Sequence, residues 1–406
     1  MSRGATTGYR VHTVRTQQEL ESLREPWRDL YANSDNATPP LLFEWQTEWW
    51  RIYGPSYATP DGLRVVTVWR HDQLVGLLPL YLSLTRSRLA PARLQFLSTG
   101  EDESEETCPD YMDLLAWRGE EEPVARSVID ALTIGGLGHW DDIVLTDVST
   151  DSVLARSWPR SWSNRWKSSV DARGKCPTAD LQGGFDAYLG RLSGNSRQQC
   201  RRILREAERA GAELQVATSE YDACEYFENL VTLHQDRWTS AGHPGCFSAP
   251  KFTEFHRTLA RRLYGQPELV LARMTVDGVP IAVLYGFVAR HKFDFYQSGV
   301  RLDGKLRLSR PGITAHLMLM SHLAGLGVTK YDFLRGSAEY KQRLSTGATT
   351  MTRLRVARPS LRSVVREVAH SCRRIRHWLK GKVTNRFASL LASLAWQSAL
   401  IMSGAA

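Results

Sequence analysis

Residues 325–341 read GLGVTKYDFLRGSAEYK, and this stretch decides how the second half of the chain is interpreted. The letters YDFL indicate a short buried strand, which ends before Gly336. Asp332 stands inside this strand, although burying a charge costs free energy unless the charge is paired. Lys341 follows in a polar turn just beyond the strand. The pattern therefore raises the question of why a carboxylate lies within the strand and a lysine beyond its end.

The segments before this stretch predict a regular order of elements. Residues 291–300 (HKFDFYQSGV) indicate another strand, and residues 301–312 (RLDGKLRLSRPG) form a polar loop. Residues 313–324 (ITAHLMLMSHLA) predict a strongly apolar helix that two following glycines end. Together with two upstream helices and a hairpin, the second half is predicted as α-α-β-β-β-α-β.

The same unit occurs twice in the chain, about 205 to 210 residues apart. Residues 51–79 and 262–284 both leave a helical stretch through R-[IL]-Y-G and then form two apolar segments around a polar turn with an Asp. Both are preceded by two amphipathic helical patterns. In the first half we expect strands near 63–70, 74–83, 92–97 and 143–147. Chance likeness between two α/β segments is the alternative interpretation.

Several short motifs in a consistent order resemble the GNAT acyltransferase superfamily. They are FEWQTEWW (43–50), LVGLLPLY (74–81), PDYMDLL (109–115), LHQDRW (233–238), SRPG (309–312), GLGVTKYDFLRG (325–336) and EYK (339–341). The order is most similar to the double-GNAT CelD-like (cellulose biosynthesis protein-like) branch, which is related to Fem-type peptidyltransferases. Together these motifs span about 300 residues, and they indicate a family rather than a substrate.

The resemblance implies an α/β fold of the α+β type, with two tandem GNAT-like lobes, each a mixed, mostly antiparallel sheet flanked by helices. We expect the first lobe at 8–175, a second, donor-binding lobe at 176–352, and a basic helical tail at 353–406. The resemblance also implies direct transfer of an acyl group from acyl-coenzyme A to an amine or a hydroxyl. Acyl-CoA is then a co-substrate, and no metal is expected.

The loop and helix start at 306–314 (LRLSRPGIT) fit a phosphate site, because the N–H groups and the dipole at a helix start attract anions. Ser309 is the expected N-cap, and Gly312 would let a phosphate approach the backbone. The resemblance assigns donor binding to Tyr296, Gln297, Arg307, Ser309, Arg310, Gly312, Ile313 and Thr314. The usual GNAT pattern is [QR]-x-x-G-x-[GA]. This sequence departs from it, because Ser309 and Thr314 stand at the two outer positions. An ordinary capped helix in a basic loop is the alternative.

The candidate acceptor-binding residues are Asp110, Tyr111, Arg197, His234, Arg237 and Trp238. Asp110 and Tyr111 are expected to face the cleft between the lobes, or else to be residues at a loop end. Arg197 starts an arginine stripe on a helix over 192–211, and this stripe is either an anion site or a solvated face. His234, Arg237 and Trp238 share one face of a predicted helix, where the histidine either assists proton transfer or packs beside the tryptophan.

Two interpretations of Asp332 and Lys341 stay open. In the catalytic one, Asp332 holds or deprotonates the acceptor nucleophile. Lys341 then reaches back over the strand end and stabilises the oxyanion, as the matching lysine is thought to do in Fem-type relatives. In the structural one, Asp332 accepts hydrogen bonds from neighbouring backbone N–H groups, and Lys341 is a surface charge.

The charge is unevenly placed along the chain. The formal net charge is +9, yet residues 353–406 alone carry +10, so the other 352 residues are near −1. The tail combines arginines with an uncharged stretch at 387–402, which fits an element on an anionic membrane surface. A tail packed on the first lobe and a contact with nucleic acid are the alternatives, and the near-neutral body makes nucleic acid the least favoured partner.

No secretory signal is predicted at the start of the sequence, and the six cysteines form no C-x-x-C pair. We therefore expect a cytoplasmic protein, located at the inner face of the membrane if the tail binds there. The leading function is an acyl-CoA-dependent N- or O-acyltransferase acting on a sugar or an envelope or exopolysaccharide precursor. The alternatives are a Fem-type aminoacyl-tRNA-dependent transferase and a non-catalytic scaffold of a polysaccharide assembly complex.

Overall fold

A computed structural model describes residues 8–84, 91–134, 136–162, 166–266, 268–302, 308–336 and 338–358. The first half contains β1 (Tyr9–Val14), α1 (Gln17–Ser22), α2 (Arg24–Ala32), η1 (Pro39–Leu41), α3 (Phe43–Tyr57), β2 (Ala58–Leu63), β3 (Val65–Arg70), β4 (Gln73–Leu78), β5 (Leu80–Ser83), β6 (Arg93–Phe96), β7 (Leu115–Ala116), α4 (Glu121–Ile134), β8 (Asp142–Ser149) and α5 (Val153–Ser161).

The second half contains β9 (Lys167–Asp180), α6 (Phe185–Arg191), α7 (Gly194–Arg209), β10 (Glu213–Val216), α8 (Glu220–Ser240), η2 (Cys246–Ser248), α9 (Pro250–Arg262), β11 (Leu269–Val276), β12 (Val279–Ala289), β13 (Lys292–Val300), α10 (Pro311–Gly325), β14 (Lys330–Asp332), α11 (Glu339–Leu344) and β15 (Gly347–Ala357). The predicted order of two helices, three strands, a helix and a strand is confirmed from α8 to β14. The two helices and hairpin of the first half are α2, α3, β3 and β4.

Local sequence explains several of these boundaries. Helix α7 starts where the Ser193 hydroxyl accepts a hydrogen bond from the Ser196 N–H, and it is followed by Gly211 at φ +65°. The β11–β12 hairpin turns through Asp277 and Gly278, which both have positive φ, as a two-residue hairpin of this type requires. Strand β14 ends at Asp332, earlier than predicted, and Leu334 adopts a positive φ of 53°.

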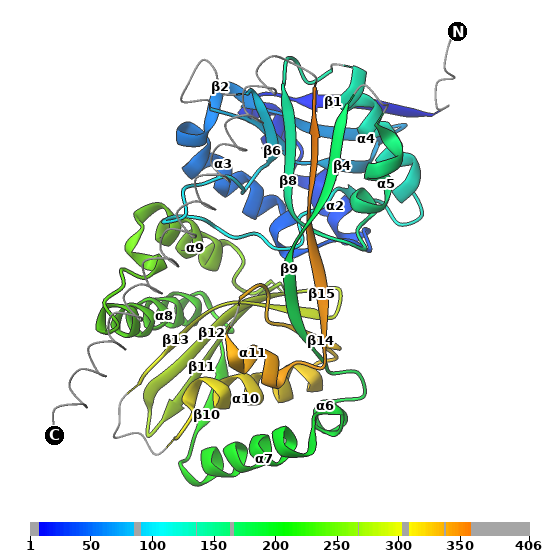
Figure 1. Cartoon of the computed structure of the whole chain (residues 1–406). Coiled ribbons are helices and arrows are strands. Elements are labelled where there is room, and N and C mark those ends of the chain that lie inside the picture. Colours follow the sequence, from blue (N-terminus) through cyan, green and yellow to red (C-terminus); the bar gives the residue numbers. More distant parts are fainter. Residues whose placement is uncertain are drawn as a thin grey trace, which may run out of the picture.

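The strands form two sheets. A small sheet in the first lobe has the order β1-β3-β4-β7, and a large sheet has the order β10-β11-β12-β13-β14-β9-β15-β8-β6-β5-β2. The large sheet runs through both lobes, which stand one above the other in Figure 1. The mixed sheets and the helices that flank them are those of a GNAT-like fold, as predicted.

Strands β9 and β15 join the lobes. They pair antiparallel along their length, from Gly347 opposite Thr178 to Ala357 opposite Lys167. In Figure 1 they run side by side from one lobe to the other. The predicted boundary after residue 175 therefore falls inside β9, and the boundary after residue 352 falls inside β15.

Helices α3 and α9 bring the two lobes together through aromatic side chains. Trp45 on α3 is buried and lies edge-on to Phe255, Phe287 and Tyr296, with ring centroids 5.3 to 5.8 Å apart. Burial of such rings contributes strongly to packing. The core of the first lobe therefore continues into α8, α9 and β12 of the second. In the part of the chain that the structure describes, no helix combines the length and the apolar character needed to cross a membrane.

Candidate functional site

Strands β13 and β14 are parallel neighbours for only three residues, from Lys292 opposite Lys330 to Asp294 opposite Asp332. Strand β13 then continues to Val300, and a bulge at Tyr296 interrupts its pairing with β12. Strand β14 stops instead. The two strands therefore part beyond this pair of aspartates.

Buried rings pack around His316 beside the point where the two strands part. The His316 ring on α10 lies 4.5 Å from Phe295, 5.6 Å from Phe333 and 5.3 Å from Tyr340, measured between centroids. The His316 Nδ1 atom is hydrogen-bonded to the Tyr331 hydroxyl at 2.7 Å. Burial lowers the pKa of His316 to about 3, so the imidazole is neutral.

Asp332 is completely buried, at 0% exposure, and its carboxylate is fully engaged. One oxygen accepts a hydrogen bond from the Leu334 N–H at 2.8 Å, and the other accepts one from the Tyr111 hydroxyl at 2.5 Å. The Lys292 ammonium lies 3.8 Å from the same carboxylate and 3.7 Å from the centre of the Tyr111 ring. The charge that pairs with Asp332 is thus Lys292, which the sequence analysis did not single out.

Lys292 is shared between two carboxylates, because it also lies 2.8 Å from Asp294. One ammonium cannot neutralise both groups, and burial penalises the carboxylate left over. Burial and the neighbouring Asp332 accordingly raise the pKa of Asp294 to about 7, although Lys292 opposes the shift. Burial and Asp332 also raise the pKa of Tyr111, so the phenol keeps its proton and donates a hydrogen bond to the Asp332 carboxylate.

Lys341 does reach back over the end of β14, as expected. Its side chain is 9% exposed, and its ammonium donates hydrogen bonds to the carbonyls of Phe333 at 2.7 Å and Arg335 at 2.8 Å. It is therefore not a surface charge, and burial lowers the pKa of its ammonium. Gly336 has φ +141°, and a Cβ there would lie 2.8 Å from the Lys341 Nζ, so glycine suits this position on both counts.

Asp110 joins the same cluster through Arg335. The Asp110 carboxylate accepts hydrogen bonds from the Arg335 side chain at 2.5 Å and from its backbone N–H at 2.9 Å. The same guanidinium lies 2.8 Å from Asp147 of β8. Sequence reasoning missed Arg335, although two buried aspartates require a cation and Arg335 directly follows the buried strand.

The structure therefore brings four predicted site residues together: Asp110 and Tyr111 from the first lobe, and Asp332 and Lys341 from the second. All four are less than 10% exposed. Cys176 of β9 completes the contact, with its sulfur 4.0 Å from the Asp110 carboxylate. The cluster closes the junction between the lobes, so Asp332 has no open face toward a substrate in this arrangement.

The three predicted residues on α8 lie in a different environment. His234 is buried, with Nδ1 3.0 Å from the Gln235 side chain and its ring 5.0 Å from Phe247. Burial lowers the pKa of His234, which is the behaviour of a packed, neutral histidine. Trp238 is 39% exposed, and Arg237 is exposed. Among the described residues, no hydrogen bond joins these three to the Asp332 cluster.

Arg197 is half-buried on α7, where its guanidinium donates to the Gly190 carbonyl at 3.3 Å. Tyr296 and Gln297 also have protein partners. The Tyr296 hydroxyl donates to the Thr107 carbonyl at 2.5 Å and lies 2.8 Å from the His256 Nε2 atom. The Gln297 amide lies 3.4 Å from the Cys246 sulfur. These contacts tie the bulge of β13 to α9, η2 and the first lobe.

The predicted donor loop is only partly as expected. The N-cap of α10 is Arg310, not Ser309, because the Ser309 backbone N–H and hydroxyl both bind the Glu206 carboxylate of α7, the hydroxyl at 2.9 Å. The Thr314 hydroxyl donates to the Arg310 carbonyl at 3.0 Å. A Cβ at Gly312 would meet Val300 at 3.5 Å, an ordinary contact.

Gly312 and Ile313 follow the proline at the first position of α10, and their backbone N–H groups lie in the first turn, where no helical carbonyl is within reach. They are the N–H groups that a phosphate at this helix start would meet. Arg307 lies outside the described residues.

Comparison with known proteins gives a family for part of the chain. Residues 194–342 match the family described as acetyltransferase (GNAT) domain. No curated protein matches the chain. The crystal structure of FemX is 11% identical, with 84% of this chain and 96% of that chain covered and a TM-score of 0.53.

Two further structures are similar at lower scores. The structure of L-PGS from Bacillus licheniformis is 11% identical, with 88% of this chain and 96% of that chain covered and a TM-score of 0.49. A tandem GNAT protein from the clavulanic acid biosynthesis pathway is 12% identical, with 87% and 99% covered and a TM-score of 0.39. At these identities the likeness concerns the fold.

The CelD-like branch stays a prediction. The match of residues 194–342 to the acetyltransferase (GNAT) domain family agrees with the strand arrangement of the second lobe and with the GNAT-like fold of the chain.

Proposed function

We propose that the protein is an acyl-CoA-dependent N- or O-acyltransferase that acts on a sugar or on an envelope or exopolysaccharide precursor by direct transfer. The supporting observation is the parting of β13 and β14 beside the start of α10, inside the matched acetyltransferase domain. The two parted strands would hold the pantetheine arm, and the helix start would receive the pyrophosphate.

Donor binding requires a rearrangement at Ser309. The Glu206 carboxylate occupies its N–H and hydroxyl, and a pyrophosphate is repelled by a carboxylate in the same place. In the proposal Glu206 releases Ser309 when the donor binds, and the N–H groups of Gly312 and Ile313 then face the phosphates.

In the proposed reaction centre, Lys341 stabilises the oxyanion of the tetrahedral intermediate, and Asp332 acts through its neighbours. The hydrogen bonds of the Lys341 ammonium go to the backbone carbonyls of Phe333, Leu334 and Arg335, so catalysis requires the ammonium to exchange one carbonyl for the substrate oxygen. Asp332 is enclosed, so its proposed part is to hold Tyr111 and the Leu334 N–H in place.

The test is calorimetric titration of coenzyme A into the wild type, Gly312→Ala and Gly312→Glu. Both substitutions start from a Cβ in ordinary contact with Val300, so alanine is a control for shape and glutamate adds a charge at the phosphate position. We expect Gly312→Ala to bind within a few-fold of wild type and Gly312→Glu to lose at least tenfold in affinity. Equal affinity for all three proteins would remove this helix start from the donor site.

The Glu206–Ser309 contact favours a second candidate function, a Fem-type aminoacyl-tRNA-dependent transferase, because its donor does not place a pyrophosphate at α10. A wild type that shows no heat with coenzyme A but transfers an aminoacyl group from charged tRNA would support this candidate. A protein that binds coenzyme A and turns over no acceptor would support the scaffold function instead.

A further inference from the structure

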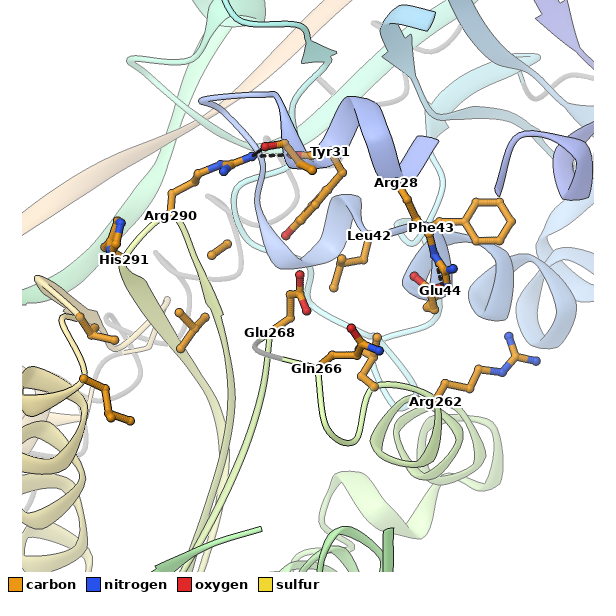
Figure 2. A pocket seen from close by; sticks show the side chains of 16 residues that line it. Arg28, Tyr31, Leu42, Phe43, Glu44, Arg262, Gln266, Glu268, Arg290 and His291 are labelled. Atoms are coloured by element: carbon orange, nitrogen blue, oxygen red, sulfur yellow. Dashed lines mark hydrogen bonds and ion pairs between the residues drawn. The ribbon is translucent and has the colours of Figure 1, made fainter. Parts of the chain in front are cut away.

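A cavity of about 600 Å³ lies between the two lobes, near the start of β13. The first turn of α10 lies near the other end of that strand, beside Val300. Its walls come from α2 and the start of α3 in the first lobe, and from the ends of α9 and α10, the start of β11 and the β12–β13 turn in the second. Figure 2 shows it between the helices of the first lobe and the β11–β12 strands. Its size is that of a site for a small organic ligand.

The arginines around this cavity are already paired. Arg28 donates to Glu44 at 2.5 Å, and Arg262 lies 3.2 Å from Glu48. Arg290 donates to the backbone carbonyls of Tyr31, Ala32 and Ser34 at 2.6 to 2.8 Å, and so closes the end of α2. An anion entering the cavity would have to compete with these partners.

Two polar groups in the cavity are left without partners. Tyr31 is 8% exposed, and its hydroxyl is buried with no hydrogen bond. Within the described ranges, no hydrogen bond or ion pair engages the Glu268 carboxylate. Figure 2 shows the Tyr31 hydroxyl and the Glu268 carboxylate pointing toward one another into the cavity, with Gln266 beside them. A buried hydroxyl without a partner is unusual and costs free energy, so its position calls for a ligand.

The inventory of these groups selects the ligand chemistry. A phenol hydroxyl donates, a carboxylate accepts, and the Gln266 amide does both. An ammonium ligand would satisfy Glu268 and offer nothing to the Tyr31 proton, whereas an anion would be repelled by Glu268. A hydroxyl group donates and accepts at once, so neighbouring hydroxyls satisfy all three side chains. Beside the paired arginines, the cavity is also lined by aliphatic side chains, among them Leu42 and Val288, which can cover the C–H faces of a sugar ring.

We propose that this cavity is a binding site for a neutral polyhydroxylated ligand of hexose size, held by Tyr31, Glu268 and Gln266. The site is separate from the proposed donor and reaction centre, and it does not depend on the proposed function. It rests on side chains from both lobes, so an occupied cavity would also tie α2 to β11.

Saturation-transfer NMR on the full chain tests the proposal, with the methyl glycosides of glucose, galactose and mannose as probes. Hexylamine and glutarate serve as the cationic and anionic comparisons. Tyr31→Phe removes one unpartnered hydroxyl, and Glu268→Gln removes the charge at equal size. The matched controls are Tyr221→Phe on α8 and Glu213→Gln on β10, which are exposed and lie outside the cavity.

We expect at least one glycoside to bind the wild type and both controls, with about 5- to 10-fold weaker binding to each cavity variant, because Tyr31→Phe removes a hydrogen bond and Glu268→Gln replaces a charged acceptor by a weaker neutral one. Tyr31→Phe should melt at or above the wild-type temperature, which shows that weaker binding is not unfolding. Absence of transfer to all three glycosides overturns the proposal. Equal binding to the cavity variants, or stronger binding of hexylamine or glutarate, also overturns it.

Discussion

Lys341 offers the sharpest test of how the end of β14 is held. Replacing it by methionine keeps the aliphatic stem and removes the ammonium. The carbonyls of Phe333 and Arg335 then lose donors at 2.7 and 2.8 Å. A buried acceptor left without a partner costs about 1–3 kcal/mol, so the two together predict a loss of about 2–6 kcal/mol in the free energy of unfolding.

The assay is urea unfolding followed by tryptophan fluorescence, with Lys330→Met as the control. Lys330 is the exposed lysine on β14 itself, and its replacement should change stability by less than about 0.5 kcal/mol. If Lys341 also stabilises an oxyanion, kcat should fall about 10²–10³-fold in the protein that remains folded. A Lys341→Met protein as stable as the control and with unchanged kcat would refute both the structural and the catalytic reasoning.

Three further predictions concern separate parts of the molecule. Burial raises the pKa of Glu101 to about 7, above the ordinary 4.5, so the folded state holds a proton that the unfolded state has lost. The free energy of unfolding should therefore fall by up to about 3 kcal/mol as the pH rises from about 4.5 to 7. Glu101→Gln should flatten the corresponding decline in melting temperature, and an unchanged decline would contradict the assignment. Glu206→Gln should strengthen coenzyme A binding several-fold by removing the carboxylate from Ser309, whereas weaker or equal affinity in the titration would show that Glu206 does not compete with the donor. Anionic vesicles should sediment the full chain and not a protein that ends at residue 358, which keeps residues 353–357 because they belong to β15. The truncated protein must melt at the same temperature as the full chain. Equal sedimentation of both proteins would place the membrane contact outside the tail.

Local patterns in the sequence were enough to predict most elements of the second lobe. The apolar run at 313–324 and the polar turn that holds Asp277 act within a few residues, so each can be recognised without knowing the fold. The repeated pattern of two helices and a hairpin predicted two related lobes for the same reason. The resemblance to GNAT acyltransferases then indicated mixed, mostly antiparallel sheets flanked by helices.

Only the tertiary structure decided which groups meet across the lobes. Lys292, Arg335 and Tyr111 surround the buried carboxylates of Asp332 and Asp110 although these three residues come from distant parts of the sequence. The same holds for Glu206 at Ser309 and for the long β9–β15 pair. A buried carboxylate predicts that a cation must be near it, because an unpaired charge is costly, but the identity of that cation depends on how the large sheet closes.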